Sequence, residues 1–551
     1  MKGTRQVHSR SRRHVLSRSD RDSALCLDGL VNAAYRAVAF TGSVPEYNRE
    51  RTGHWIAVVS ESVLVRDSEG SDIESQLLPI LDVSLEMRKF HVQAYLGMSP
   101  KVNPKFWLAF PVSVPPLGFS TYIISNAEKS VSGRPLMSKT SESATGVTEI
   151  GHGNLKLTFD EGRLSRYLNS RKKVNMSLQQ SYIYYAGDDG SGVDFQASGA
   201  YIFRPNGTVQ IQPAQVPLTV MRGPLLDEVH QQINPWIHQV GPVPVDDKIG
   251  KEVVTQITTH MTNDRTFYTD SNGRDFIKRI RDYRTDWDLE VHQPVAGNYY
   301  PINLGIYMVD NSLEFSVLVD RSVGGSSISD GQLELMLHRR LLHDDGRGVA
   351  EALNETVCVD DNCAGLTVQG KFYVRIDPLG DGSKWRRSVG QEIYSPLLIA
   401  FSEQKGGDWM QSHVPTFTAM DPSYSLPDNV ALITLQALED GSVLLRLAHL
   451  YEVGEDKDLS VMAKVELTKM FPDKKIENIK EMSLSANQGR AEMEKKRLVW
   501  KVEGSTGAEQ QRRLRGGPVD LSKLVVELGP MEIRTFVITF SHLSFLKVVD
   551  R

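Results

Sequence analysis

Apolar and polar residues alternate, or run apolar for four to eight positions, along most of the chain after residue 56. Residues 306–309, 313–319 and 333–338 show this pattern clearly, and each run has the length of a β-strand. Helical spacing of apolar residues is confined to short stretches such as residues 458–471. The pattern therefore predicts a mainly β protein.

Two segments have the pattern of strand, turn and strand. Pro205-Asn-Gly-Thr208 separates residues 201–204 from a second β-rich run, and Asn-Gly tolerates the positive φ of a tight turn. Glu439-Asp-Gly-Ser442 separates two apolar runs in the same way. We predict a hairpin at each. Many antiparallel strands must stack or close to hide their edges, so the predicted architecture is a series of antiparallel β-sandwich domains.

Breaks in the pattern predict the domain boundaries. Residues 127–146 are rich in Ser, Thr, Gly and Pro without periodicity, as linkers are, and two prolines interrupt the pattern within residues 421–429. The first residues are basic and match no strand pattern. The predicted units are an unplaced basic segment over 1–55 that we expect to be disordered, a small β domain over 56–126, a linker over 127–146, a large central super-sandwich over 147–420 and a C-terminal β-sandwich over 421–551.

Composition and charge exclude several classes of protein. The chain has 551 residues, 40% hydrophobic and 24% charged, and no apolar run reaches the roughly 18 residues of a membrane span. Its net charge of −5 gives no general attraction to nucleic acid. We therefore expect neither a membrane nor a nucleic-acid partner. The start of the chain lacks the apolar stretch of a secretory signal, so as written the product would be cytosolic.

The densest polar cluster is residues 335–348, where a predicted strand enters a glycine-rich turn. Arg347 stands between two glycines, and its planar guanidinium is suited to gripping sugar hydroxyls or a carboxylate. The alternative is a surface ion pair between Asp345 and Arg347. His343 and Asp345 form a His-x-Asp pair without a third ligand nearby, so no metal site is predicted. Phosphate-loop, dinucleotide-binding, zinc-protease and nucleophile-elbow motifs do not occur.

Cysteines and glycosylation motifs depend on the compartment. Cys358 and Cys363 are close enough in sequence for a small disulfide, or for two reduced thiols in a loop, and Cys26 would remain unpaired. Asn-x-Ser/Thr acceptors are relevant only on the secretory route. These acceptors are Asn175, Asn206 and Asn354.

Six blocks of sequence together carry a resemblance to a known family. They are Gln196-Ala-Ser-Gly-Ala-Tyr-Ile-Phe-Arg-Pro-Asn, Phe267-Tyr-Thr-Asp-Ser-Asn-Gly-Arg, Gln293-Pro-Val-Ala-Gly-Asn-Tyr-Tyr-Pro-Ile-Asn, Val319-Asp-Arg-Ser-Val-Gly-Gly-Ser-Ser, Leu333-Glu-Leu-Met-Leu-His-Arg-Arg-Leu-Leu-His-Asp-Asp-Gly-Arg-Gly and Pro530-Met-Glu-Ile-Arg-Thr-Phe. These blocks resemble the lysosomal or vacuolar α-mannosidases of glycoside hydrolase family 38, of the plant type, and the resemblance is colinear from about residue 56 to 541.

The resemblance covers the C-terminal β half of the family and implies that the catalytic α/β domain is absent. The family's retaining mechanism uses an aspartate nucleophile, a carboxylic acid/base and a zinc ion, and such carboxylates stand about 5–5.5 Å apart. The motifs that supply them are not found, so no catalytic or zinc-binding residue is carried over, and we expect no zinc on this chain alone. Tyr201 and Arg347 match the aromatic and the arginine that reach the sugar pocket in complete relatives.

The resemblance also implies a function and a location. The family hydrolyses terminal α-mannose of N-glycans and oligosaccharides in the vacuole, the lysosome or outside the cell. We expect this chain alone to be inactive, with mannose-containing glycans and a separately made catalytic portion as partners. Alternatives are a non-catalytic carbohydrate-binding fragment and a truncated gene-model product. Between Val240 and Gly241 the family has additional residues, and residues 1–55 match nothing in it.

Overall fold

The structure is a computed structural model that describes residues 34–40 and 56–541, except residues 81, 101–102, 127–135, 138, 144–145, 152, 193, 212–214, 232–241, 360–361, 369, 405–412 and 499–514. The described chain consists mainly of antiparallel sheets, which confirms the predicted fold class. Cys26 and the junction between Val240 and Gly241 lie outside the described residues. None of the helices in the described part is both long and apolar enough to cross a bilayer.

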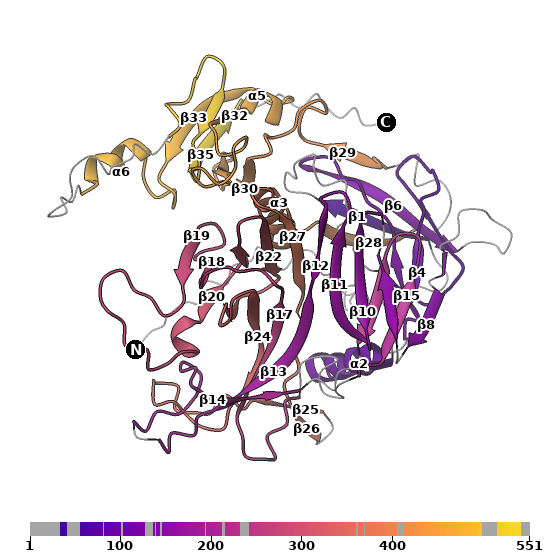
Figure 1. The fold of residues 1–551 in the computed structure, drawn as a ribbon. Helices are drawn as coiled ribbons and strands as arrows, with labels where there is room; N and C mark the ends of the chain where they lie inside the picture. Colours follow the sequence, from indigo (N-terminus) through magenta and orange to yellow (C-terminus); the bar gives the residue numbers. More distant parts are fainter. Residues whose placement is uncertain are drawn as a thin grey trace, which may run out of the picture.

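Two sheets form the N-terminal region, and Figure 1 draws their early strands in indigo and purple and the late strands β28 and β29 in brown to orange. Their buried faces share a core that includes Val65, Leu77, Leu108 and Ile124. The strand orders are β28-β1-β6-β29, with β3 beside β6, and β2-β5-β4-β7. The strands are β1 (Ala34–Phe40), β2 (Ile56–Val58), β3 (Val63–Arg66), β4 (Gln76–Pro79), β5 (Phe106–Ala109), β6 (Gly118–Asn126), β7 (Leu136–Met137), β28 (Leu398–Gln404) and β29 (Thr416–Thr418).

Three parts of this region depart from the predicted boundaries. β1 lies inside the segment expected to be disordered, yet its backbone pairs with β6 and β28. β8 (Lys139–Ser143) lies inside the predicted linker and pairs with β15 (Leu218–Arg222), because a Ser- and Thr-rich strand at a sheet edge needs no apolar alternation. β28 and β29, assigned by sequence to the central sandwich, return to the N-terminal sheet.

The central region contains a four-stranded sheet, β12-β11-β10-β9, a six-stranded sheet, β14-β13-β17-β24-β23-β20, and a five-stranded sheet, β19-β18-β21-β22-β27. All three contribute to one core, in which Phe267, Phe315 and Leu335 are fully buried. The strands are β9 (Val147–Ile150), β10 (Leu155–Asp160), β11 (Arg163–Asn169), β12 (Val174–Ser177), β13 (Gln179–Gly187), β14 (Pro205–Gln210), β16 (Asp227–Gln231), β17 (Lys251–Thr258), β18 (Thr266–Asp270), β19 (Phe276–Ile280), β20 (Tyr300–Ile302), β21 (Gly305–Val309), β22 (Leu313–Val319), β23 (Val323–Ser326), β24 (Gln332–Arg340), β25 (Thr356–Val359), β26 (Asn362–Gly365) and β27 (Phe372–Pro378).

The C-terminal sandwich stacks β30-β31-β35-β33 on β32-β34 around buried Leu447, Val465 and Phe536. Its first hairpin confirms the predicted turn, where Gly441 has a φ of +82°. The strands are β30 (Val430–Ala437), β31 (Val443–His449), β32 (Ala463–Glu466), β33 (Ile476–Met482), β34 (Val525–Leu528) and β35 (Ile533–Phe540).

The other predicted hairpin is wrong. Residues 201–204 are not a strand, and Asn206-Gly207 lies inside β14, opposite the register shift of β13 between Tyr185 and Gly187. The positive φ of Gly207 therefore serves a β-bulge, where one strand has an extra residue, and not a turn.

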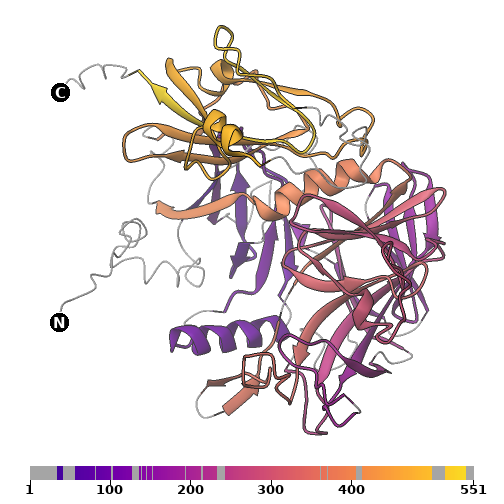
Figure 2. The ribbon, with the colours of Figure 1, turned by 90° about the vertical axis from the view of Figure 1, so that its left-hand side faces the viewer.

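Four α-helices occur in the described residues: α2 (Asp82–Leu96), α3 (Gly382–Tyr394), α5 (Leu467–Met470) and α6 (Arg490–Lys496), together with the 3₁₀ turn η4 (Ala296–Asn298). Of the predicted helical stretch 458–471, only α5 is helical. α3 was not predicted, because its Trp385, Val389 and Ile393 stand among polar residues, but these three pack beside Leu304 and Leu318. Figures 1 and 2 show α3 between the central sheets and the C-terminal sandwich.

Candidate functional site

Two loops at one end of the six-stranded sheet carry the predicted site residues. β13 and β24 both pair antiparallel with β17, on its two sides, so they run in the same direction. Their C-terminal ends face the same residue of β17, because Lys251 pairs with Ala186 on one side and with Arg340 on the other. The loops that follow therefore start about 10 Å apart, two strand spacings, at the same edge.

The carboxylate of Asp345 joins these two loops. Its Oδ2 accepts hydrogen bonds from the backbone N–H of Tyr201 (2.6 Å) and Ile202 (2.8 Å), and its Oδ1 accepts one from the N–H of Arg347 (3.2 Å). Burial acts to raise the pKa of Asp345, but these backbone donors and the charge of Arg347 hold it below its ordinary value. Asp345 is thus a buried residue that links the two loops through their backbones. The alternative, a surface ion pair with Arg347, is wrong.

Glycines allow the loops to approach each other. A Cβ on Gly199 would lie 2.6 Å from the Asp345 side chain, so a larger residue would push the loops apart. Gly346 and Gly348, on either side of Arg347, have φ values of +69° and +107°, which L-residues rarely adopt. The sequence therefore needs glycine at these three positions to present Tyr201 and Arg347 together.

Arg339, near the end of β24, also holds the loop that contains Tyr201. Its guanidinium donates to the carbonyl oxygens of Gly199 (2.9 Å) and Ala200 (3.2 Å) and through Nε to Glu252 on β17 (2.7 Å). The Glu252 side chain is fully buried. Burial raises the pKa of Glu252 to about 7, against the opposing effect of the Arg339 charge.

An aromatic cluster anchors the segment that follows Tyr201. The ring of Phe203 packs edge-on against Tyr299, with centroids 4.8 Å apart, and against Tyr185 at 5.6 Å. The hydroxyls of both tyrosines donate to the buried carboxylate of Glu334, at 2.8 Å from Tyr185 and 2.7 Å from Tyr299. Burial and the nearby Glu334 raise the pKa of both tyrosines, so they stay neutral donors.

The result is a rigid polar rim, which we define as Tyr201, Asp345, Arg347 and Gln196. The Arg347 guanidinium donates to Oε1 of Gln196, whose amide donates to the carbonyl oxygen of Asp345 (2.9 Å). Tyr201 is 68% exposed, and Arg347 is also exposed. An exposed aromatic ring and a planar cation on fixed backbones can bind a sugar through its C–H face and its hydroxyls.

The structure brings the two predicted substrate-binding residues together, and sequence reasoning missed the residues that hold them. Arg339 and Glu252 were not singled out, because their partners lie 140 and 87 residues away along the chain. The signal available in the sequence was the run of polar and charged residues at the end of an apolar strand. Such residues beside a loop are often braces.

The other predicted positions lie on other elements. Asn175 on β12 and Asn206 on β14 are exposed. Asn354 is half-buried, and its Oδ1 accepts a hydrogen bond from Nε of Arg340. Cys358 and Cys363 are joined by a disulfide across the β25–β26 hairpin. Within the described ranges, no three His, Cys, Asp or Glu side chains form a group that could hold a metal ion.

Comparisons with known proteins match most of the described chain. Residues 150–347 match the glycosyl hydrolases family 38 C-terminal domain, and residues 429–536 match the C-terminal beta sandwich domain of the same family. Residues 73–124 match the lysosomal alpha-mannosidase-like central domain.

Named relatives agree with these matches. The chain is 58% identical to an alpha-mannosidase of Arabidopsis thaliana, over 88% of this chain and 49% of the relative. It is 50% identical to the alpha-mannosidase of Canavalia ensiformis, over 88% and 51%, and 36% identical to human lysosomal alpha-mannosidase, over 78% and 43%. The chain thus spans about half the length of the relatives it matches.

A solved structure has a similar fold. A protein in glycosyl hydrolase family 38 from Enterococcus faecalis superimposes with a TM-score of 0.51, covering 94% of this chain and 60% of that protein. The two sequences are 10% identical over this region, so the likeness concerns the fold alone.

Proposed function

The chain belongs to glycosyl hydrolase family 38 through the C-terminal domains that it carries, and from that premise we propose that it is the β-sandwich half of an α-mannosidase. The proposed activity of the whole enzyme is hydrolysis of terminal α-mannose in N-glycans and related oligosaccharides. The observation that carries this proposal is the 58% identity to a plant alpha-mannosidase across 88% of the chain.

In this proposal the polar rim is the contribution of this chain to the sugar pocket. The exposed ring of Tyr201 packs on the C–H face of mannose, and Arg347 donates hydrogen bonds to neighbouring hydroxyls. Asp345 fixes both backbones, so little conformational entropy is lost when the sugar binds. The Gln196–Arg347 contact supports this role, because it keeps the guanidinium extended at the rim.

The chemical step is proposed to require residues outside this chain. The family's retaining mechanism requires two carboxylates and zinc, and the described residues contain no group that fits a metal ion, so no step is assigned to zinc here. We propose that this chain alone does not turn over mannosides and that a separately made catalytic portion is its partner. The disulfide supports a vacuolar, lysosomal or extracellular location, since such bonds persist in oxidising compartments.

The test combines turnover with binding. The purified 551-residue chain is assayed with a chromogenic α-mannoside at acidic and neutral pH with zinc present, and mannose binding is followed by calorimetry. We expect no turnover, and weak saturable binding that Arg347→Ala reduces about tenfold through loss of charged hydrogen bonds. Arg171→Ala, at an exposed position on another loop, is the matched control and should leave binding unchanged.

Two results would contradict the proposal in different ways. Zinc-dependent turnover by the chain alone would show that it contains its own catalytic site. Equal mannose binding by the chain and by Arg347→Ala would remove the polar rim from the sugar pocket.

A second candidate, a non-catalytic carbohydrate-binding protein, is favoured by the exposure of Tyr201. It is distinguished by adding the catalytic portion of a family member. Mannose binding that never leads to turnover in the mixture would support the second candidate.

A further inference from the structure

Strand β14 is an open edge of the six-stranded sheet. Among the described strands it pairs only with β13, and Figure 1 shows it at the lower margin of the central region. Because one side of β14 is unpaired, every second residue directs its backbone N–H and C=O groups outward. Five of its six side chains are exposed, including Val209 at 44%. This edge therefore offers its backbone groups to a further strand.

The sequence of β14 lacks the charges that usually protect such an edge. Natural edge strands often carry charged side chains, which resist pairing with a second molecule. Both edges of the neighbouring five-stranded sheet do so, with Lys278 and Arg279 on β19 and Arg375 and Asp377 on β27. β14 reads Pro-Asn-Gly-Thr-Val-Gln, which is uncharged, and its Thr and Val favour β-structure. Its first residue, Pro205, removes a single backbone donor.

An acceptor for N-linked glycans lies on this same strand. In Asn206-Gly-Thr208 all three residues are exposed, and within the described chain the Asn206 side chain forms no hydrogen bond. A glycan is bulky and hydrophilic, so at this position it stands beside the unpaired backbone of β14. It would supply the protection that charged side chains give to the other edges.

The other two acceptors make contacts of their own. Asn175 is exposed, but its Oδ1 accepts a hydrogen bond from Nε of Arg166 at 2.7 Å. Asn354 is half-buried, and its Oδ1 accepts a hydrogen bond from Nε of Arg340. A glycan on either residue would crowd an existing contact, whereas one on Asn206 displaces no side-chain contact of the described chain.

We propose that Asn206 carries an N-linked glycan, and that this glycan keeps the edge of β14 from pairing with a second copy of the chain. In the modifying step, Nδ2 of Asn206 bonds to the anomeric carbon of a lipid-linked oligosaccharide. The bond from that carbon to the lipid diphosphate breaks, and Nδ2 loses one proton. The donor belongs to the secretory route, so the proposal rests on the location proposed for the protein but not on mannoside hydrolysis.

Peptide mass spectrometry tests the modification. The 551-residue chain is produced behind a cleavable secretory leader and is mapped before and after enzymatic release of glycans, which converts a glycosylated asparagine to aspartate. We expect this conversion at Asn206 and none at Asn354. Thr208→Ala should abolish the conversion, whereas Thr208→Ser, which keeps the acceptor hydroxyl, should retain it.

The disulfide separates two kinds of failure. A sample in which Cys358 and Cys363 are joined has passed through an oxidising compartment. An unmodified Asn206 in that sample would overturn the proposal, and conversion at Asn354 equal to that at Asn206 would contradict selection by exposure. Conversion at Asn206 with both cysteines reduced would support the glycan and contradict the location argued from the disulfide.

Light scattering tests the role of the glycan. We expect Thr208→Ala to aggregate about tenfold faster than the glycosylated chain, and Thr208→Ser to behave as the glycosylated chain does. Val209→Lys places a charge on the same edge and should restore slow aggregation when combined with Thr208→Ala. Ser177→Ala removes the acceptor at Asn175 and should change nothing, because β12 follows three basic residues.

Circular dichroism checks that each variant is folded. Thr208 and Val209 are exposed, so their variants should fold. If Thr208→Ala does not, Asn206→Gln removes the same glycan with another substitution and decides in its place. Aggregation that is no faster without the glycan, or that Val209→Lys fails to slow, would contradict protection of the edge.

Discussion

At the scale of single residues, Asp345 decides how the polar rim is held. One carboxylate accepts three backbone hydrogen bonds from two loops, and the donors on the far loop lie more than 140 residues away along the chain. Ionised acceptors form stronger hydrogen bonds than neutral ones. Rim geometry therefore depends on the charge of this residue and not only on its shape.

Asp345→Asn tests that dependence. The substitution keeps the size but replaces the ionised acceptor, so we expect the amides of Tyr201 and Ile202 to exchange with solvent roughly tenfold faster. Hydrogen exchange read by mass spectrometry or NMR measures this directly. Asp344→Asn, at the exposed neighbouring position, should leave both amides unchanged. Unaltered protection in Asp345→Asn would show that the loops are held by other contacts.

Glu252 makes stability depend on pH. Its pKa is raised from 4.5 to about 7, mainly by burial, so between these values the native state holds a proton that the unfolded chain has released. The stabilisation that the protonated Glu252 side chain contributes to the native state is complete below pH 4.5, and it is lost as the pH rises through about 7. The linked free energy is on the order of 3 kcal/mol.

Glu252→Gln mimics the protonated carboxyl and should remove this loss. Melting temperatures measured at pH 5 and pH 8 should therefore fall less in the variant than in the unaltered chain. Glu351→Gln, at an exposed loop position, serves as the control and should show the unaltered pH dependence. If Glu252→Gln and the unaltered chain lose melting temperature equally between pH 5 and pH 8, the pH dependence does not come from Glu252.

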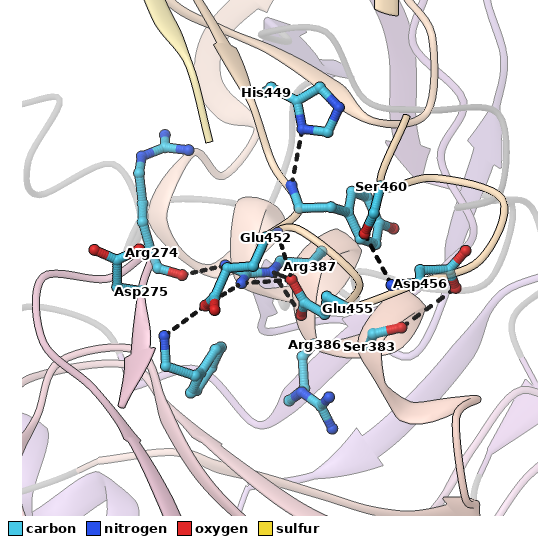
Figure 3. A network of polar contacts seen from close by, with 12 residues as sticks. Arg274, Asp275, Ser383, Arg386, Arg387, His449, Glu452, Glu455, Asp456 and Ser460 are labelled. Carbon is cyan, nitrogen blue, oxygen red and sulfur yellow. Dashed lines mark hydrogen bonds and ion pairs between the residues drawn. The ribbon is translucent and has the colours of Figure 1, made fainter. Parts of the chain in front are cut away.

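At the scale of elements, helix α3 joins the central sheets to the C-terminal sandwich. Arg386 pairs with Glu314 on β22 at 2.8 Å and lies over the ring of Tyr307. Its buried neighbour Arg387 pairs with Glu452 and Glu455, which follow β31 (Figure 3). Two adjacent side chains of one helix thus hold two different sandwiches.

Replacing one of them should loosen the C-terminal sandwich. Arg387→Leu leaves Glu452 and Glu455 without their cation, so we expect a loss of unfolding free energy of about 3 kcal/mol. Lys384→Leu, on the same helix, removes a 44% exposed cation whose pairs with Asp456 and Asp458 are longer than 3.4 Å, and should cost under about 1 kcal/mol. Denaturant titration compares them. Equal losses would contradict the importance of burial at Arg387.

The elements show which patterns the sequence could reveal. The hairpin of β30 and β31 was predictable, because its turn and both apolar runs are adjacent in the chain. The Asn-Gly at residues 206–207 has the same local preference, but its partner strand β13 imposes a bulge. α3 was missed because its buried face includes Arg386 and Arg387, whose partners lie on distant elements. Local propensity does not contain such tertiary pairings.

At the scale of the whole molecule, the N-terminal sheet is completed from far along the chain. β6 is paired by β29, and β1 is paired by β28, after the chain has passed through the central region. Breaks in the sequence pattern predict domains that are each continuous along the chain. The family and its β-sandwiches could therefore be predicted, but the pairing of β28 and β29 with the N-terminal sheet could not. At the polar rim, likewise, the resemblance identified Tyr201 and Arg347 but not the residues that brace them.

Gly118 provides a test of the pairing between β6 and β29. A Cβ at this position would lie 1.9 Å from the carbonyl oxygen of Phe417 in β29, so Gly118→Ala must displace one strand from the other. We expect a loss of about 1–3 kcal/mol in unfolding free energy, as overpacking typically produces. Gly192→Ala, where a Cβ meets nothing within 4 Å, should be neutral. Denaturant titration that finds both variants equally stable would argue against the β6–β29 contact.

The return of β28 and β29 also orders events during protein synthesis. β1 and β6 leave the ribosome long before β28 and β29, which flank this pair of strands, whereas the strands β9 to β27 of the central region have all emerged before β28. The middle of the chain is therefore able to fold first, while the earliest sheet waits with open edges that a chaperone would have to cover. Protease digestion of ribosome-bound chains whose residues up to about 395 have left the exit tunnel should leave the central sandwich intact and the N-terminal sheet cleaved.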